Sequence, residues 1–231
     1  MQPELQPVNT GYGGVAIPQQ SQKVLRNTYM LLALTMVPTV IGAWVGIQLA
    51  PLMVASPFIT FFVMLAWVIG LQVGIIKFRN SPIGIGLLLL MTLGLGAFIG
   101  PLLNVALQLK NGMQLVGYAA AGTGVIFFGM GALAATIKRD LAPMGKFLFV
   151  GMIALLVAMF ANMFLQIPAL ALAISTLVIV VFSLYLLYDL NRIIRGGETN
   201  YVMATTGVYI SLLNIFTSLL QLLMALSGER D

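Results

Sequence analysis

Five long stretches of this chain contain no Asp, Glu, Lys or Arg. About 20 predominantly apolar residues are enough to cross the hydrocarbon core of a bilayer, so each stretch can hold at least one crossing. The first and the fourth are long enough for two crossings, and each has a polar or proline-containing break near its middle. The sequence therefore predicts an all-α integral membrane protein with seven transmembrane helices. The charge-free stretches are residues 27–76, 80–109, 111–137, 147–188 and 199–228.

The composition leaves no material for a second, water-soluble domain. Hydrophobic residues make up 60% of the chain and charged residues 7%, whereas an average soluble domain is about one-quarter charged. Residues 1–22 are rich in Gln, Pro and Gly and lack an apolar core, which predicts a disordered cytoplasmic tail. Residues 23–231 then form one membrane domain, with predicted spans at residues 27–49, 57–76, 83–107, 114–137, 147–166, 169–194 and 203–226.

The positions of the basic residues predict the orientation in the membrane. With the N-terminus in the cytoplasm, nine Lys and Arg residues lie in cytoplasmic segments, and only Lys110 and Arg230 lie outside. This is the excess of positive charge expected of cytoplasmic loops, so the net charge of +5 does not indicate nucleic-acid binding. A six-crossing alternative, in which the last segment re-enters and returns the C-terminus to the cytoplasm, moves only Arg230. Seven crossings are preferred because residues 203–226 are long enough to span.

The residue inventory argues against an enzyme and against a bound cofactor or metal. The chain has no Cys and no His, which removes thiol chemistry and the commonest general base and metal ligand. A zinc protease motif of the H-E-x-x-H type is absent. An intramembrane aspartyl protease needs two facing acids, and the predicted spans contain one. We therefore predict a protein without catalytic activity.

Small and amide residues inside the spans have two interpretations each. Glycines four residues apart let another backbone come close, either inside the bundle or at a dimer face; the pairs are Gly42 with Gly46, Gly70 with Gly74, and Gly96 with Gly100. Gly100-Pro101 is also expected to break the third helix near its outer end. Amides in lipid must find partners, either as hydrogen bonds between helices or along a polar path; they are Gln72, Asn104, Asn162, Asn214 and Gln221.

Asp189 is the one acid in the predicted spans. It lies about 9 Å inside the last turn of the sixth helix, at the rise of an α-helix. An ionised carboxylate there is costly unless it is paired, and Arg192, three residues later, falls on the same helix face. Two interpretations stay open: an ion pair at the helix end, or a titratable gate.

Several runs around this acid resemble the Bax inhibitor-1 family. Residues 182–191 resemble the sixth-helix signature of that family, residues 197–201 its following loop, and residues 209–216 its last helix. Residues 23–29, 100–104 and 162–170 resemble a bacterial branch represented by a modulator of the membrane protease FtsH. The resemblance covers the chain from about residue 23 to its end. It implies a seven-helix bundle with the last helix at its centre, in a bacterial inner membrane. Seven crossings from a cytoplasmic N-terminus place the C-terminus in the periplasm.

For function, the resemblance implies a membrane protein that modulates a membrane-anchored AAA protease of the FtsH type, which would hold the N-terminal tail. The alternative it implies is a pH-sensitive leak for calcium or other cations, gated by Asp189. The second acid of that sensor is replaced here by Ser211, so a single-site titration is expected. Lys77 or Arg79 is the candidate for the base on the second helix; Arg192 and Asn214 complete the candidate residues. A purely structural bundle is a third possibility.

Overall fold

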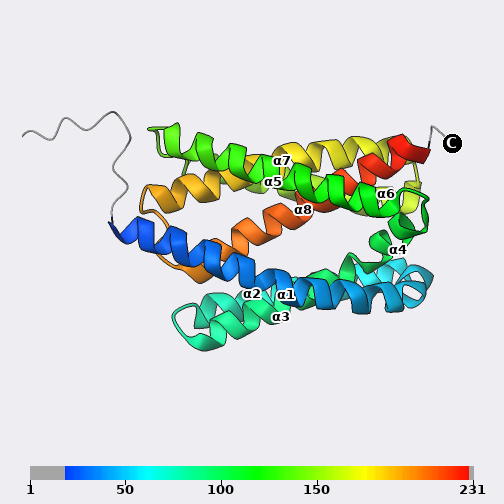
Figure 1. Cartoon of the computed structure of the whole chain (residues 1–231), viewed down its shortest axis with the longest axis horizontal. Helices are drawn as coiled ribbons and strands as arrows, with labels where there is room; N and C mark the ends of the chain where they lie inside the picture. Colours follow the sequence, from blue (N-terminus) through cyan, green and yellow to red (C-terminus); the bar gives the residue numbers. More distant parts are fainter. Residues whose placement is uncertain (1–18, 229–231) are drawn as a thin grey trace, which may run out of the picture.

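The computed structural model describes residues 19–228, and in this part of the chain it contains helices and no strands. Seven spans are long and apolar enough to cross a membrane, because α3 and α4 together make one crossing. The prediction of an all-α membrane protein with seven transmembrane helices is therefore confirmed (Figure 1). The helices are α1 (Gln19–Ala55), α2 (Pro57–Phe78), α3 (Pro82–Phe98), α4 (Gly100–Gln108), α5 (Gly112–Thr136), α6 (Met144–Leu165), α7 (Pro168–Ile194) and α8 (Tyr201–Gly228).

The two ends of the bundle differ in charge. The first turns of α1 and the α2–α3, α5–α6 and α7–α8 connections lie at one end, which we call the basic end (Figure 1, left). The segments at this end carry Lys23, Arg26, Lys77, Arg79, Lys138, Arg139, Lys146, Arg192 and Arg195. Helix α8 runs from the basic end to the opposite end, where the described chain stops. The re-entrant alternative for the last segment is therefore not what the structure shows. That the basic end faces the cytoplasm stays a prediction.

Helix α1 begins at Gln19, inside the range predicted as a tail. Residues 1–18 lie outside the described residues. Ser21 and Val24 in the first turns of α1 are buried, so the start of this helix packs on the rest of the bundle. The predicted tail from residue 1 to residue 22 as a whole stays a prediction.

Two of the predicted helix breaks are found beside prolines, whereas Pro51 lies inside the continuous helix α1. Only Ile99 separates α3 from α4, because Pro101 has no N–H to continue the hydrogen-bond ladder. Between α6 and α7, Gln166 adopts the left-handed conformation with φ of 51°, and the Asn162 side chain accepts a hydrogen bond from the Ile167 N–H at 3.2 Å. Helices α6 and α7 are therefore joined by a tight turn.

Two of the three glycine pairs bring α1 into backbone contact with α3 and α4. A Cβ atom on Gly42 would collide with the Leu93 carbonyl oxygen, and one on Gly46 with the Ala97 carbonyl oxygen. From the other side, a Cβ on Gly96 would collide with the Thr39 carbonyl oxygen. These glycines are thus used for packing within the chain. Gly70 on α2 is different, because a Cβ there would meet nothing within 4 Å.

Helix α8 contacts α1, α2, α3, α4, α5 and α7. Its Tyr209 is 1% exposed, and the Tyr209 hydroxyl shares a 2.8 Å hydrogen bond with the Thr39 hydroxyl of α1. The Tyr209 hydroxyl also donates to the Thr92 carbonyl of α3, at 3.4 Å. One buried hydroxyl therefore links three helices deep in the bundle. That α8 forms the centre of the bundle stays a prediction.

Helix α2 packs mainly on α3, and toward the end opposite the basic end its phenylalanine rings meet those of α6. The Phe58 and Phe164 ring centroids are 4.9 Å apart, and the Phe61 and Phe160 centroids 5.6 Å apart. These contacts place α2 beside the α6–α7–α8 side of the bundle, which sets the position of the candidate site.

The close contact between α1 and α3 gives a testable prediction. Replacing Gly46 with Leu should lower the free energy of unfolding by about 1–3 kcal/mol, because the new side chain overlaps the Ala97 backbone. The measurement is SDS-driven unfolding in mixed micelles. Gly70→Leu is the matched control, and its free energy of unfolding should be close to that of the wild-type protein. Equal losses in the two variants would contradict the assigned contact.

Candidate functional site

A cavity of about 180 Å³ lies near the basic end, between α2, α7, α8 and the connector that joins α7 to α8. It combines two carboxylates and one guanidinium with an amide and apolar side chains. We call it the Asp189 cavity. Its lining residues are Gln72, Asp189, Arg192, Glu198, Met203, Ala204, Thr206, Gly207 and Ile210.

The Asp189 carboxylate is packed against the backbone of α8. A Cβ atom on Gly207 would lie 2.6 Å from Asp189 Oδ2 and 3.4 Å from Oδ1. Glycine at position 207 is therefore what leaves room for the acid between the two helices. Among the described residues, no side chain or backbone N–H donates a hydrogen bond to Asp189. The acid thus faces the cavity without a hydrogen-bond donor from the described chain.

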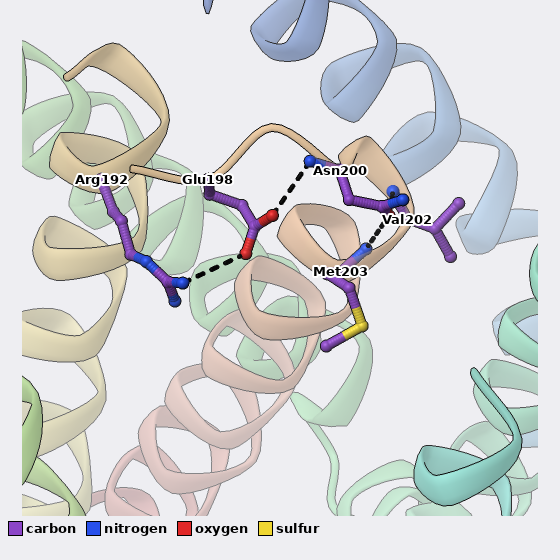
Figure 2. Close-up of polar contacts among 5 residues, drawn as sticks. All are labelled: Arg192, Glu198, Asn200, Val202 and Met203. Atoms are coloured by element: carbon purple, nitrogen blue, oxygen red, sulfur yellow. Dashed lines mark hydrogen bonds and ion pairs between the residues drawn. The ribbon is translucent and has the colours of Figure 1, made fainter. Parts of the chain in front are cut away.

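The ion pair at this helix end is not the one that the sequence indicated. Arg192 Nη2 lies 3.5 Å from Glu198 Oε2 (Figure 2), and no ion pair joins Arg192 to Asp189 within residues 19–228. The reason is the chain reversal after α7. Gly196 has a left-handed φ of 76°, and the N–H groups of Gly197 and Glu198 both donate to the Arg192 carbonyl, at 2.9 and 3.1 Å. This helix-ending turn folds the connector back and delivers Glu198 to Arg192.

Glu198 also sets the start of α8. Its Oε1 accepts a hydrogen bond from the Asn200 N–H at 2.9 Å. The Asn200 side-chain oxygen in turn accepts from the N–H groups of Val202 and Met203, both at 3.0 Å (Figure 2), which satisfies donors that have no partner inside the helix. One chain of polar contacts therefore runs from Arg192 to the first turn of α8.

The Asn200 amide ties this connector to the α2–α3 loop. Its Nδ2 donates to the Arg79 carbonyl at 2.9 Å and to Asn80 Oδ1 at 2.8 Å. A second cavity, of about 340 Å³, lies beside these bonds and is lined by residues of both loops, among them Arg79, Ser81 and Tyr201. The α7–α8 connector, the start of α8 and the α2–α3 loop are thus fixed relative to one another.

Not all predicted site residues come together. Ser211 is buried and does not line the Asp189 cavity; it lies four residues beyond Gly207, about 6 Å along α8. Lys77 and Arg79 do not line this cavity either, and Gln72 is the residue that α2 contributes. Asn214 donates to the Ile210 carbonyl of its own helix at 2.8 Å. Of the six candidate residues, only Asp189 and Arg192 line the same cavity.

The membrane amides form fewer bonds between helices than expected. Gln221 accepts a hydrogen bond from the Ser175 hydroxyl of α7 at 2.7 Å. Asn162 and Asn214 bond backbone groups of their own helix or its following turn. Gln72 Oε1 is buried without a hydrogen-bond partner in the described chain and faces the Asp189 cavity. Polar side chains therefore cluster at this cavity. Among the described residues they do not form a continuous polar path through the bundle.

Two further residues of α7 have a role that sequence reasoning missed. Asn191, which is fully buried, accepts a hydrogen bond from the Leu141 N–H at 3.2 Å. Arg195 Nη2 donates to the Ile137 carbonyl at 2.5 Å. Both bonds hold the α5–α6 loop. The signal in the sequence was a cluster of polar residues at the end of an apolar helix. The prediction had considered only Asp189 and Arg192 from this cluster.

The described residues of the cavity supply few of the ligands that a metal ion takes. Within residues 19–228 no group of three or more Asp, Glu, His or Cys side chains converges. Calcium usually takes six to eight oxygen ligands, and here Arg192 already lies beside one of the two acids of the cavity. The available elements are a carboxyl group without a partner and a guanidinium near two acids.

The fold and this site define a multi-pass α-helical membrane protein, and the comparisons with known proteins place it in a family. The sequence model described as "Inhibitor of apoptosis-promoting Bax1" matches residues 21–228. The chain belongs to the Bax inhibitor-1 family, as the resemblance indicated.

Bacterial relatives match most of the chain. The protein named "Modulator of FtsH protease YccA" from Escherichia coli is 40% identical, with 88% of this chain and 90% of YccA covered. NMA0420 of Neisseria meningitidis is 41% identical over 89% of this chain and 92% of its own length. PA2604 of Pseudomonas aeruginosa is 38% identical over 93% and 95%.

The packing of Asp189 against α8 predicts the effect of one methyl group. Gly207→Ala should lower the free energy of unfolding by about 1–3 kcal/mol, because the new Cβ overlaps Asp189 Oδ2. Adding Asp189→Ala should restore part of the loss, with a coupling energy of about 0.5–3 kcal/mol in the double-mutant cycle. Gly151→Ala, where a Cβ meets only ordinary contacts, is the control. Strictly additive effects would show that the two residues do not touch.

Proposed function

We propose that this chain is an inner-membrane protein that modulates a membrane-anchored AAA protease of the FtsH type by binding it, and that it is not itself an enzyme. The observation that carries the proposal is the 40% identity to YccA, which covers 88% of this chain and 90% of YccA. The name of that relative states which protease it modulates, and a second YccA protein is named as an inner membrane protein.

The structure is compatible with a binding role. The basic end has an ordered surface, since the α2–α3, α5–α6 and α7–α8 connections are all fixed by side-chain hydrogen bonds from Asn191, Arg195 and Asn200. Nine basic residues lie on the segments at this end. We place it in the cytoplasm by the positive-inside rule. The protease would therefore meet a shaped and charged surface.

The residues of the site support the proposed non-catalytic role. The chain contains no His and no Cys, and one of the two carboxylates of the Asp189 cavity is paired with Arg192. A protease of aspartyl type needs two facing acids, and the described chain has only Asp189 inside a membrane helix.

The first test is binding and its consequence. The full-length chain should co-purify with an FtsH-type protease from bacterial membranes, and overproduction should slow the degradation of another membrane substrate of that protease. A bundle protein of similar size and charge, produced at the same level, controls for crowding of the membrane. Unchanged substrate turnover together with no co-purification would overturn the proposed function.

A second prediction concerns the N-terminal segment. A variant lacking residues 1–18 should fold, because α1 begins at Gln19, and should lose co-purification with the protease. A variant in which these residues are replaced by a Gly/Ser segment of equal length separates sequence from length. Equal co-purification of the truncated and full-length chains would show that the protease binds the bundle and not this segment.

A further inference from the structure

The second cavity at the basic end is large enough to hold a small ligand. Its volume of about 340 Å³ falls within the range of about 300–1,000 Å³ that small-molecule sites occupy. It lies between the α2–α3 loop and the start of α8, and residues of both segments line it. We call it the Arg79 cavity. It is separate from the Asp189 cavity, since the two share no lining residue.

The charge of the Arg79 cavity favours an anion. Arg79 is the one cation that lines it, and no acid lines it. Within residues 19–228, no ion pair involves Arg79. The nearest acid along the chain is Glu198, whose carboxylate already contacts Arg192 and the Asn200 N–H. The guanidinium of Arg79 is therefore available to a negatively charged ligand.

The hydrogen bonds beside the cavity leave further donors free. Asn200 Oδ1 accepts from two N–H groups of α8, so its Nδ2 is the group that bonds the α2–α3 loop. This Nδ2 donates to Asn80 Oδ1, which leaves the two N–H groups of Asn80 Nδ2 without an acceptor in the described chain. The Tyr201 hydroxyl also has no hydrogen-bond partner among residues 19–228. Asn80 and Tyr201 both line the cavity.

The cavity lies at the depth of lipid headgroups. Helix α2 has 22 residues and is about 33 Å long, which is close to the thickness of about 30 Å of the hydrocarbon core. The loop that follows Phe78 therefore lies at the edge of this core. Ile76 and Phe78 on α2 and Ile83 on α3 expose large apolar side chains next to the loop. A ligand in the cavity thus has donors on one side and lipid-facing apolar surface on the other.

A phospholipid combines the two features that this position requires. Its phosphate is an anion with several acceptor oxygens, and arginine binds phosphate through parallel N–H groups. Its acyl chains cover apolar surface. Basic pockets between membrane helices are a known way to bind anionic lipid headgroups. A free phosphate ion or a carboxylate on a soluble partner would leave the apolar surface at Phe78 and Ile83 unused.

We propose that the Arg79 cavity binds the phosphate group of an anionic membrane phospholipid. Arg79 pairs with the phosphate, and Asn80 and Tyr201 donate to oxygen atoms of the headgroup. The acyl chains lie along the exposed apolar side chains of α2 and α3. The bound lipid bridges the α2–α3 loop and the start of α8, which are held together in the protein by the Asn200 amide. This inference does not depend on the protease.

Native mass spectrometry of the full-length protein, released from detergent micelles, counts bound lipids and tests the proposal. The purified protein is titrated with phosphatidylglycerol, and in parallel with phosphatidylcholine, whose headgroup has no net charge. Phosphatidylglycerol should bind more tightly. Arg79→Gln should weaken its binding at least about tenfold, because a hydrogen bond to a charged group is lost. Tyr201→Phe, which keeps the ring, should weaken it about two- to tenfold.

The matched control is Arg139→Gln, which removes the same charge from an exposed position of the basic end outside the cavity. It should bind phosphatidylglycerol as the wild-type protein does. Equal losses in Arg79→Gln and Arg139→Gln would overturn the proposal, because they would show a general attraction of lipid to basic residues. In a competition arm, inorganic phosphate and glycerol 3-phosphate should not displace the lipid. Displacement by either would assign the cavity to a soluble phosphate and overturn the lipid assignment.

Discussion

The bundle depends on direct contact between helix backbones. Lipid chains are as apolar as leucine, so burial of apolar side chains gives little drive for helices to associate inside a membrane. Close approach is what remains, and glycine permits it. Gly42 and Gly46 on α1 meet Leu93 and Ala97 on α3, while Gly96 meets Thr39 from the other side. This contact holds α1 directly against α3 and α4.

The basic end is organised by the last turn of α7. Three polar residues there hold two different loops: Asn191 and Arg195 bond the α5–α6 loop, and Arg192 bonds Glu198 of the connector to α8. Because these bonds leave from one short helix segment, the two loops share a support. Asp189 lies on the preceding turn, with Gly207 of α8 against it. The acid is therefore close to the residues that set the shape of the whole surface.

The fold could be predicted further than the site because the fold follows local rules. Charge-free length gave the seven crossings, and proline gave the breaks at Ile99 and after Gln166. The partner of Arg192 could not be obtained this way, since Asp189 and Glu198 are both within its reach along the chain. The choice depends on the left-handed turn at Gly196, which sends Glu198 back over the helix end. The Gly196-Gly197 pair was the available signal. Likewise, Gly70 and Gly46 have similar local sequence, and only the three-dimensional neighbours distinguish them.

The length of α1 has a mechanical consequence. Its 37 residues extend about 55 Å, whereas the hydrocarbon core is about 30 Å thick, and an ordinary tilt absorbs only a small part of the difference. The polar first turns of α1 therefore extend beyond the acyl chains while remaining helical. Ser21 in these first turns is buried and lies beside Gly196 of the connector. A pull applied to the chain at Gln19 would therefore act two residues from the contact with the α7–α8 connector, and no loop lies between them.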